Sequence, residues 1–248
     1  MNQERVIELK KVSKAFFTRG LGESSHRQAV LTDVTLSLSP GETYGFVGLN
    51  GAGKTTTIKS MMGLIKPDSG SVRIFGQEPD SACFQKIGFA PEKPGFYESL
   101  SGKETIDFSA RLLNVDVSSP RKNEMLERVG LFQDRDKRVG AYSKGMQQRL
   151  GIACAMLHDP DLYILDEPGS GLDPLGRRLI KDILGDLKRA GKTVFFSTHI
   201  IGDLVDLCDK IALIHRGKIM FEGTLGSFNP KGLDLEERFV ELIQNECV

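Results

Sequence analysis

The chain has 248 residues, 40% of them hydrophobic and 27% charged, which is typical of a folded domain with a sizeable core. Lysine plus arginine balances aspartate plus glutamate at 33 each, so the overall charge does not favour nucleic-acid binding. No apolar run approaches the roughly 18 residues that cross a bilayer, and residues 1–10 do not resemble a signal peptide. We therefore expect a soluble protein whose action at a membrane, if it has one, needs a partner.

The cysteines give no indication of a disulfide framework or a metal site. Cys83, Cys154, Cys208 and Cys247 are far apart and form no Cys-x-x-Cys pair. Three of them lie in apolar segments, where cysteine usually behaves as a small buried hydrophobe. We expect reduced thiols, as in a cytosolic protein.

The first part of the chain is predicted to consist mainly of strands. Alternating apolar residues place them at 6–9, 32–38, 42–47, 71–75 and 87–90. Glycine, serine and charged residues gather at 18–28, which predicts a mobile hairpin loop. A helix is expected at 53–64, after a glycine-rich turn.

From about residue 91 to 157 the pattern changes to helices, without a convincing strand between them. These helices are expected at 102–113, 121–129 and 144–157. Strands are expected again at 162–165, 193–197, 210–214 and 218–222, and helices at 175–190, 201–207 and 235–244. This order predicts an α/β fold with a mainly parallel sheet, an N-terminal antiparallel β region and an inserted helical subdomain.

Residues 48–55 read Gly-Leu-Asn-Gly-Ala-Gly-Lys-Thr and fit the phosphate-binding pattern Gly-x-x-x-x-Gly-Lys-[Ser/Thr] in full. In such a loop, backbone N–H groups surround phosphate oxygens at the positive end of a helix. Lys54 would bridge the β- and γ-phosphates of ATP, and the Thr55 hydroxyl would hold Mg²⁺. A glycine-rich structural turn is the alternative. The candidate ATP-binding residues of this P-loop are Gly48, Leu49, Asn50, Gly51, Ala52, Gly53, Lys54, Thr55 and Thr56.

A second candidate site follows the apolar strand predicted at 162–165, which ends in Asp166 and Glu167. In a parallel sheet, the C-terminal end of a strand lies beside the ligand crevice. Asp166 suits a carboxylate linked to Mg²⁺, and Glu167 is placed to orient and deprotonate an attacking water. Either acid alone would usually be a solvated charge, but the P-loop upstream favours catalysis. His199 also follows a predicted strand, where a histidine is more often structural than catalytic.

Residues 142–150, Tyr-Ser-Lys-Gly-Met-Gln-Gln-Arg-Leu, resemble the signature motif of ABC-transporter ATPases, Leu-Ser-Gly-Gly-Gln followed by Gln-Gln-Arg. The chain departs from the motif at Tyr142, Lys144 and Met146, where the family tolerates variation. A serine at a helix N-terminus beside a glycine is also a good contact for phosphate. The resemblance implies that this helix contacts the ATP of a partner subunit through Ser143, Gly145 and Gln147.

The resemblance continues in order along nearly the whole chain. It implies that Phe16 stacks on adenine, although Phe17 competes for this role and either could belong to the core. Asp173, in Ser-Gly-Leu-Asp-Pro, falls in the D-loop that crosses to the partner subunit. His199, preceded by Ser-Thr, matches the switch histidine that contacts the γ-phosphate in this family.

One departure concerns the Q-loop. Residues 87–92 match this motif, but Glu92 replaces its usual glutamine. A carboxylate there can coordinate Mg²⁺ or orient water, although it adds negative charge near the triphosphate. The alternative is a solvated loop acid.

The resemblance implies a single ABC ATPase domain with a P-loop NTPase core. Its expected parts are a nucleotide-binding α/β core at 1–90 and 158–224, a helical subdomain with the signature motif at 91–157, and a C-terminal helical extension at 225–248. Because each motif occurs once, a working unit would need a second ATPase subunit, identical or a close paralogue, packed head-to-tail with the first.

Our main hypothesis is the ATP-hydrolysing subunit of an ABC transporter, similar to exporter-type ATPases. It would need ATP and Mg²⁺ and would sit on the cytoplasmic face of the cell membrane through separate permease subunits, with no nucleic acid as partner. The alternative is a soluble ABC-type ATPase acting on nucleic acid, ribosomes or cluster assembly. A P-loop kinase or GTPase is disfavoured by the signature-like segment and by the lack of a guanine-reading Asn-Lys-x-Asp.

Overall fold

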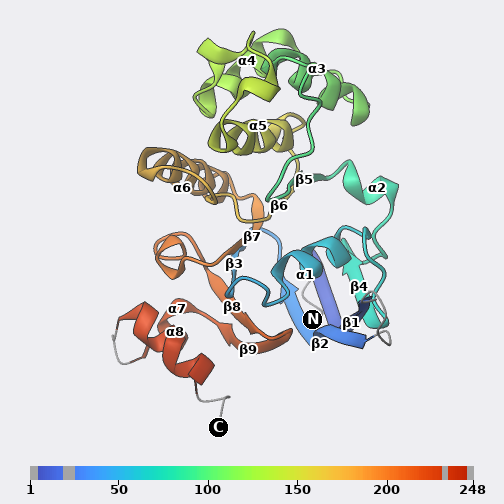
Figure 1. Cartoon of the computed structure of the whole chain (residues 1–248), viewed down its shortest axis with the longest axis vertical. Coiled ribbons are helices and arrows are strands. Elements are labelled where there is room, and N and C mark those ends of the chain that lie inside the picture. Colours follow the sequence, from blue (N-terminus) through green and yellow to red (C-terminus); the bar gives the residue numbers. More distant parts are fainter. Residues whose placement is uncertain (1–4, 19–25, 231–233, 245–248) are drawn as a thin grey trace. The chain divides into compact units, whose positions relative to one another are not determined.

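The computed structural model in Figure 1 describes residues 5–18, 26–230 and 234–244. Most of the predicted hairpin loop (19–25) and Cys247 lie outside the described residues. The chain divides into two compact units, and each is described by itself. The first comprises Met1–Cys83 and His199–Val248, and the second comprises Phe84–Thr198. The finer division predicted at 90/91, 157/158 and 224/225 stays a prediction.

An antiparallel sheet occupies the N-terminal part of the first unit, as predicted. Its strands are β1 (Ile7–Thr18), β2 (His26–Leu38) and β4 (Ser69–Ile74), in the order β2-β1-β4. β1 pairs with both neighbours and extends well beyond the strand predicted at 6–9. Its register with β2 shifts at three places between Leu9 and Ala15. Each shift interrupts the alternation of apolar residues, so the sequence pattern reveals only the first part of the strand.

The same unit contains the strand that leads into the P-loop. β3 (Thr43–Val47) is buried throughout and pairs in parallel with β8 (Lys210–His215), which pairs in antiparallel with β9 (Lys218–Gly223). The helices of this unit are α1 (Lys54–Met61), α7 (Leu225–Phe228) and α8 (Leu235–Gln244), while α2 (Ser81–Phe84) spans the sequence boundary between the units. α8 has the bounds predicted for it, and α7 was not predicted.

The helix predicted at 201–207 is wrong. The chain forms only a 3-10 turn at Ile201–Asp203, and Asp206 has a left-handed φ of 66° that a continuing α-helix does not allow. Ile201, Leu204 and Leu207 are all buried. Their spacing of three residues imitates a helix in the sequence, but it equally suits a short tight turn.

The second unit begins with a parallel sheet. β5 (Ile87–Ala90), β6 (Leu162–Leu165) and β7 (Thr193–Thr198) are neighbours in that order, with Ala90 opposite Leu165 and Leu165 opposite Phe196. β5 and β6 have the predicted bounds. β6 and β7 are buried along their whole length, and this burial is the reason that β6 and the middle of β7 are apolar.

The remaining helices belong to this unit, and each of its four longer α-helices begins at a residue whose side chain caps the helix. They are α3 (Gly102–Leu112), α4 (Ser119–Arg128), α5 (Lys144–Met156) and α6 (Pro174–Arg189), with 3-10 turns at Phe132–Asp134 and Val139–Ala141. Their caps are Ser101, Ser118, Ser143 and Asp173. Residues 91–157 are all described and contain no strand, as predicted, apart from an isolated bridge between Ser101 and Arg138.

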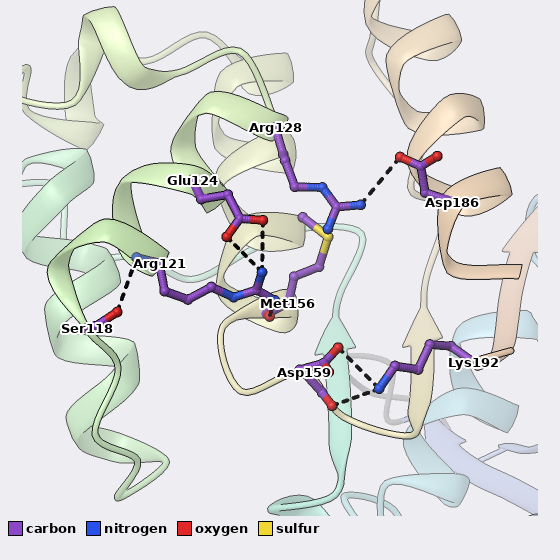
Figure 2. A network of polar contacts seen from close by, with 8 residues as sticks. All are labelled: Ser118, Arg121, Glu124, Arg128, Met156, Asp159, Asp186 and Lys192. Carbon is purple, nitrogen blue, oxygen red and sulfur yellow. Dashed lines mark hydrogen bonds and ion pairs between the residues drawn. The ribbon is translucent and has the colours of Figure 1, made fainter. Parts of the chain in front are cut away.

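Polar contacts join the helices of this unit at their edges (Figure 2). On α4, Arg128 Nη2 lies 3.5 Å from Asp186 Oδ2 of α6. In the segments that lead into β6 and β7, Lys192 Nζ lies 3.1 Å from Asp159 Oδ1 and donates to the Asp159 carbonyl at 3.0 Å. Partly exposed ion pairs of this kind contribute at most about 1 kcal/mol each, so they add little to the stability of the fold.

Two further expectations concern the cysteines and possible membrane spans. Cys83, Cys154 and Cys208 form no disulfide in the part of the chain that the structure describes, and burial raises the pKa of the Cys154 thiol to about 11. A thiol of that kind stays protonated and unreactive at neutral pH. Within the same described residues, no helix is both long and apolar enough to cross a membrane.

Candidate functional site

The P-loop connects β3 to α1 with the geometry that a phosphate-binding loop needs. Gly53 has a φ of 112° and serves as the N-cap of α1 without a side-chain cap. A Cβ atom at this position would lie 2.8 Å from Leu31 Cδ2 and 3.1 Å from the Val30 carbonyl oxygen, so glycine is required by both conformation and space. No side chain caps the positive end of α1, which suits the binding of an anion there.

Lys54 is the first residue of α1 and not a loop residue. Only 6% of it is exposed, and its Nζ atom donates to the carbonyl oxygens of Gly48 at 2.6 Å and Leu49 at 3.2 Å. The ammonium group thus lies inside the curve of the loop. Thr55 and Thr56 follow it and are half-buried. The predicted phosphate-binding residues thus form one continuous segment, with Gly48 to Gly53 in the loop and Lys54, Thr55 and Thr56 in the first turn of α1.

The acidic pair lies at the C-terminal end of β6, as expected. Asp166 is 2% exposed and Glu167 is 7% exposed. The Asp166 backbone N–H donates to the Ala90 carbonyl at 2.8 Å, which continues the pairing between β5 and β6. Glu167 has a left-handed φ of 50°, so the chain turns sharply at this residue.

A residue that the sequence analysis did not single out connects the two acids. The Ser197 hydroxyl, at the end of β7, donates to Asp166 Oδ1 at 2.6 Å and accepts from the Glu167 N–H at 2.9 Å. Ser197 is fully buried. In the sequence, Ser197 could be noticed only as a small polar residue near the end of an apolar strand. Its position opposite the acids depends on the pairing of β6 with β7, which the sequence does not give.

Glu92 lies at the same edge of this parallel sheet. It follows β5 by two residues and is half-buried, while Ala90 of β5 lies opposite Leu165, which precedes Asp166. The structure therefore places the Q-loop and the acidic pair at adjacent strand ends. His199 directly follows β7 and is exposed, and it belongs to the other unit.

The signature-like segment forms the start of α5. The exposed Ser143 is the N-cap, and its hydroxyl oxygen accepts from the Met146 N–H at 3.2 Å. A Cβ atom on Gly145 would lie 3.0 Å from Leu172 Cδ2, so a larger residue would press on the D-loop. Gln147 Nε2 donates to the Val139 carbonyl at 3.3 Å, within its own subunit. Ser143 and Gly145 are presented at one helix end, where an anion would be favoured.

The D-loop and the aromatic candidates are the remaining predicted residues. Asp173 is the N-cap of α6 and accepts from the Gly176 N–H at 2.7 Å. Phe16 is 38% exposed and Phe17 is 71% exposed, so the alternative that either belongs to the core is wrong. The Lys14 ammonium lies 5.7 Å from the centre of the Phe16 ring, which leaves this ring in a polar, accessible environment.

The donor chemistry fits a nucleotide-bound magnesium ion. The described residues contain no cluster of three or more His, Cys, Asp or Glu that could hold a metal by themselves. Mg²⁺ on a nucleotide does not need one, since it is usually held by one or two protein oxygens together with phosphates and water. The Thr55 hydroxyl and the buried Asp166 carboxylate, oriented by Ser197, are oxygen donors of the required kind.

Residues 31–170, which include the P-loop, the signature-like segment and the acidic pair, match the family model described as ABC transporter. The chain belongs to the ABC transporter family. The predicted P-loop NTPase fold class and the resemblance drawn from the motifs are thereby confirmed. The roles of individual site residues in this ABC domain stay predictions.

Curated relatives agree with this assignment. The bacitracin transport ATP-binding protein BcrA of Bacillus licheniformis is 42% identical over 79% of this chain and 65% of its own length. A fluoroquinolones export ATP-binding protein of Mycobacterium tuberculosis is 41% identical over 73% of this chain and 60% of its own length. The matched region spans 60% to 65% of the length of the first curated relatives.

A solved structure supports the same fold. The ATP-binding cassette MJ0796, described as a dimer in a post-hydrolysis state bound to ADP and Pi, superposes with a TM-score of 0.77 at 26% identity. The superposition covers 88% of this chain and 98% of MJ0796.

Proposed function

We propose that this chain is the ATP-binding and ATP-hydrolysing subunit of an ABC transporter. The observation that carries the proposal is a buried acidic pair at the end of β6, held by Ser197, in a chain that also has a complete P-loop at the start of α1. Membership of the ABC family supports assigning both features to one nucleotide. The ADP and Pi of the MJ0796 structure support hydrolysis as the reaction.

In the proposed mechanism, Lys54 and the P-loop N–H groups hold the phosphates, and Thr55 and Asp166 hold Mg²⁺. The metal ion, when bound, would neutralise charge on the β- and γ-phosphates. Glu167 would accept a proton from the attacking water and orient it. Glu92, in the Q-loop, would coordinate Mg²⁺ or orient the water. His199, the switch histidine, would contact the γ-phosphate, and Phe16 would stack on adenine.

We further propose that two such subunits act together. Ser143 and Gly145, with Gln147 nearby, would contact the ATP held by the other subunit, and Asp173 would reach across from the D-loop. The exposure of Ser143 at a helix N-terminus supports this role, as does the description of MJ0796 as a dimer.

The transport role follows from the relatives. We propose that the chain works at the cytoplasmic face of the cell membrane with separate permease subunits, and that the direction is export. The bacitracin transport and fluoroquinolones export relatives support this reading over a soluble ABC ATPase acting on ribosomes or nucleic acid.

Gentle detergent extraction of membranes from the source cells, followed by capture of the tagged chain, tests the transport role. We expect a protein with several membrane-spanning helices to co-purify, and ATP hydrolysis to be stimulated when this protein is present. Recovery of the chain with ribosomes or nucleic acid, and with no membrane protein, would favour the alternative instead.

The role of Glu92 is tested by restoring the usual residue of the Q-loop. We expect Glu92→Gln to retain ATP hydrolysis within a few-fold of the wild type, because an amide can still orient water or contact the metal ion. Steady-state phosphate release measures this, with Glu98→Gln, on an exposed part of the same segment, as the control. A loss of about tenfold, which is about 1.4 kcal/mol in barrier, would show that Glu92 serves as an essential acid.

A further inference from the structure

We infer that Ser197 is a positioning residue for the reaction, and that it sets the orientation of both acids through one hydroxyl group. This inference rests on the proposed function, since it assigns Asp166 to Mg²⁺ and Glu167 to water. Ser197 and both acids belong to the second compact unit, and the hydrogen bonds between them lie within that unit.

The hydroxyl of Ser197 both donates and accepts a hydrogen bond. A serine hydroxyl has one proton to donate, and here that proton is directed to Asp166 Oδ1 at 2.6 Å. The same oxygen accepts the Glu167 N–H at 2.9 Å. Ser197 is 0% exposed, so water does not compete for either hydrogen bond. A short hydrogen bond to a buried carboxylate is charge-assisted and stronger than one between neutral groups.

The first consequence concerns Asp166. A hydrogen bond to one oxygen of a carboxylate fixes the rotation of that group about its Cβ–Cγ bond. Oxygen ligands of Mg²⁺ must satisfy a demanding octahedral geometry, so the metal is sensitive to this rotation. Partners that orient metal ligands commonly change metal affinity or activity by about 10- to 100-fold when they are removed.

The second consequence concerns Glu167, whose backbone is held on both sides. Its N–H donates to Ser197, and its carbonyl oxygen accepts from the Ser170 N–H at 2.9 Å and from Gln148 Nε2 at 3.5 Å. The left-handed φ of 50° is unfavourable for a glutamate and persists only where the surroundings enforce it. Ser197 therefore holds the peptide from which the Glu167 side chain projects.

The test compares Ser197→Ala, which removes the hydroxyl, with Ser197→Cys, which keeps the shape and leaves a weak donor. The matched control is Thr105→Val, because Thr105 is also buried and its hydroxyl donates to the Ser101 carbonyl at 2.8 Å on α3. The full chain is titrated with a fluorescent ATP analogue in EDTA and in increasing Mg²⁺. Phosphate release and thermal unfolding are measured on the same samples.

We expect Ser197→Ala to raise the Mg²⁺ concentration needed to tighten binding of the analogue by about tenfold, and to lower kcat by a similar factor. Binding in EDTA should stay within about twofold, since it depends on the P-loop. Ser197→Cys should lie between alanine and the wild type. Thr105→Val should lower only the unfolding temperature.

An unchanged Mg²⁺ dependence and kcat in Ser197→Ala, with a fall in unfolding temperature like that of the control, would overturn the inference. If Ser197→Ala does not fold, the same comparison is made with Ser197→Cys: a shifted Mg²⁺ dependence supports the inference, and an unshifted one overturns it. A wild-type chain that binds the analogue no better with Mg²⁺ and releases no phosphate would instead overturn the proposed function, and this inference with it.

Discussion

Glu167→Gln is expected to bind ATP, to hydrolyse it very slowly and to accumulate as an ATP-dependent dimer. Glutamine keeps the size of the side chain and its hydrogen bonds to water, but it cannot accept a proton. Loss of a general base commonly lowers the rate by about 10²- to 10⁴-fold. The side chain is 7% exposed and directly follows Asp166, so an isosteric change disturbs the packing little. Phosphate release and light scattering with and without MgATP measure the two effects on one sample.

The control for this variant is Glu127→Gln, since Glu127 is exposed on α4 of the same unit. It should hydrolyse ATP like the wild type. Turnover at the wild-type rate in Glu167→Gln would contradict the assignment of Glu167 as the base. Absence of a dimer would not, because some ATPases of this family dimerise only when their membrane subunits hold them together.

A second substitution on the Glu167→Gln background tests the head-to-tail arrangement. Ser143→Arg should abolish the ATP-dependent dimer, since it places a bulky side chain where the partner's ATP is proposed to bind. It also removes the N-cap of α5, which alone costs about 1 kcal/mol of stability. Ser118→Arg is therefore the matched control, because Ser118 is an exposed N-cap serine on α4. A dimer that survives Ser143→Arg would contradict the arrangement.

Lys54→Ala is expected to weaken MgATP binding by more than about a hundredfold, which is about 2.7 kcal/mol. The buried ammonium group lies inside the loop on the Gly48 and Leu49 carbonyls, so its removal takes away both a phosphate contact and two contacts that hold the loop. Equilibrium titration with a fluorescent ATP analogue measures the loss. Because the Glu167 and Ser197 contacts lie in the other unit, they should be unaffected.

Lys59→Ala provides the control for Lys54→Ala, since Lys59 lies on the exposed side of the same helix. This variant should bind the analogue like the wild type. Thermal unfolding of both variants separates a binding defect from a folding defect. Unchanged affinity in a folded Lys54→Ala protein would remove the P-loop assignment.

Several features of this protein could be predicted because they are written in adjacent residues. The P-loop is one unbroken string, and its glycines, Lys54 and Thr55 are recognisable without any knowledge of their neighbours in space. β5 and β6 were predicted with their observed bounds, because buried parallel strands are short apolar runs that end abruptly. The acids after β6 and the signature-like segment belong to the same class of local signal.

Other features are decided by the backbone conformation and contacts of the folded chain, and the apolar and polar pattern of the sequence does not contain them. β1 was predicted too short because its bulges break the alternation that identifies a strand. The apolar spacing at 201–207 suited a helix until the left-handed Asp206 excluded it. Lys54 has the charge of a surface residue, but the carbonyls of its own loop bury it.

The sequence by itself determined the family, the order of the motifs and the chemical type of each candidate site residue, because these are properties of short stretches of chain. The tertiary structure decided which side chains hold those residues in place. Ser197 lies 30 residues from Glu167 and 31 from Asp166 in the chain, and only the parallel register of β6 and β7 brings its hydroxyl between them. Register is set by the burial of whole strands against one another, which is why no single segment of the sequence predicts it.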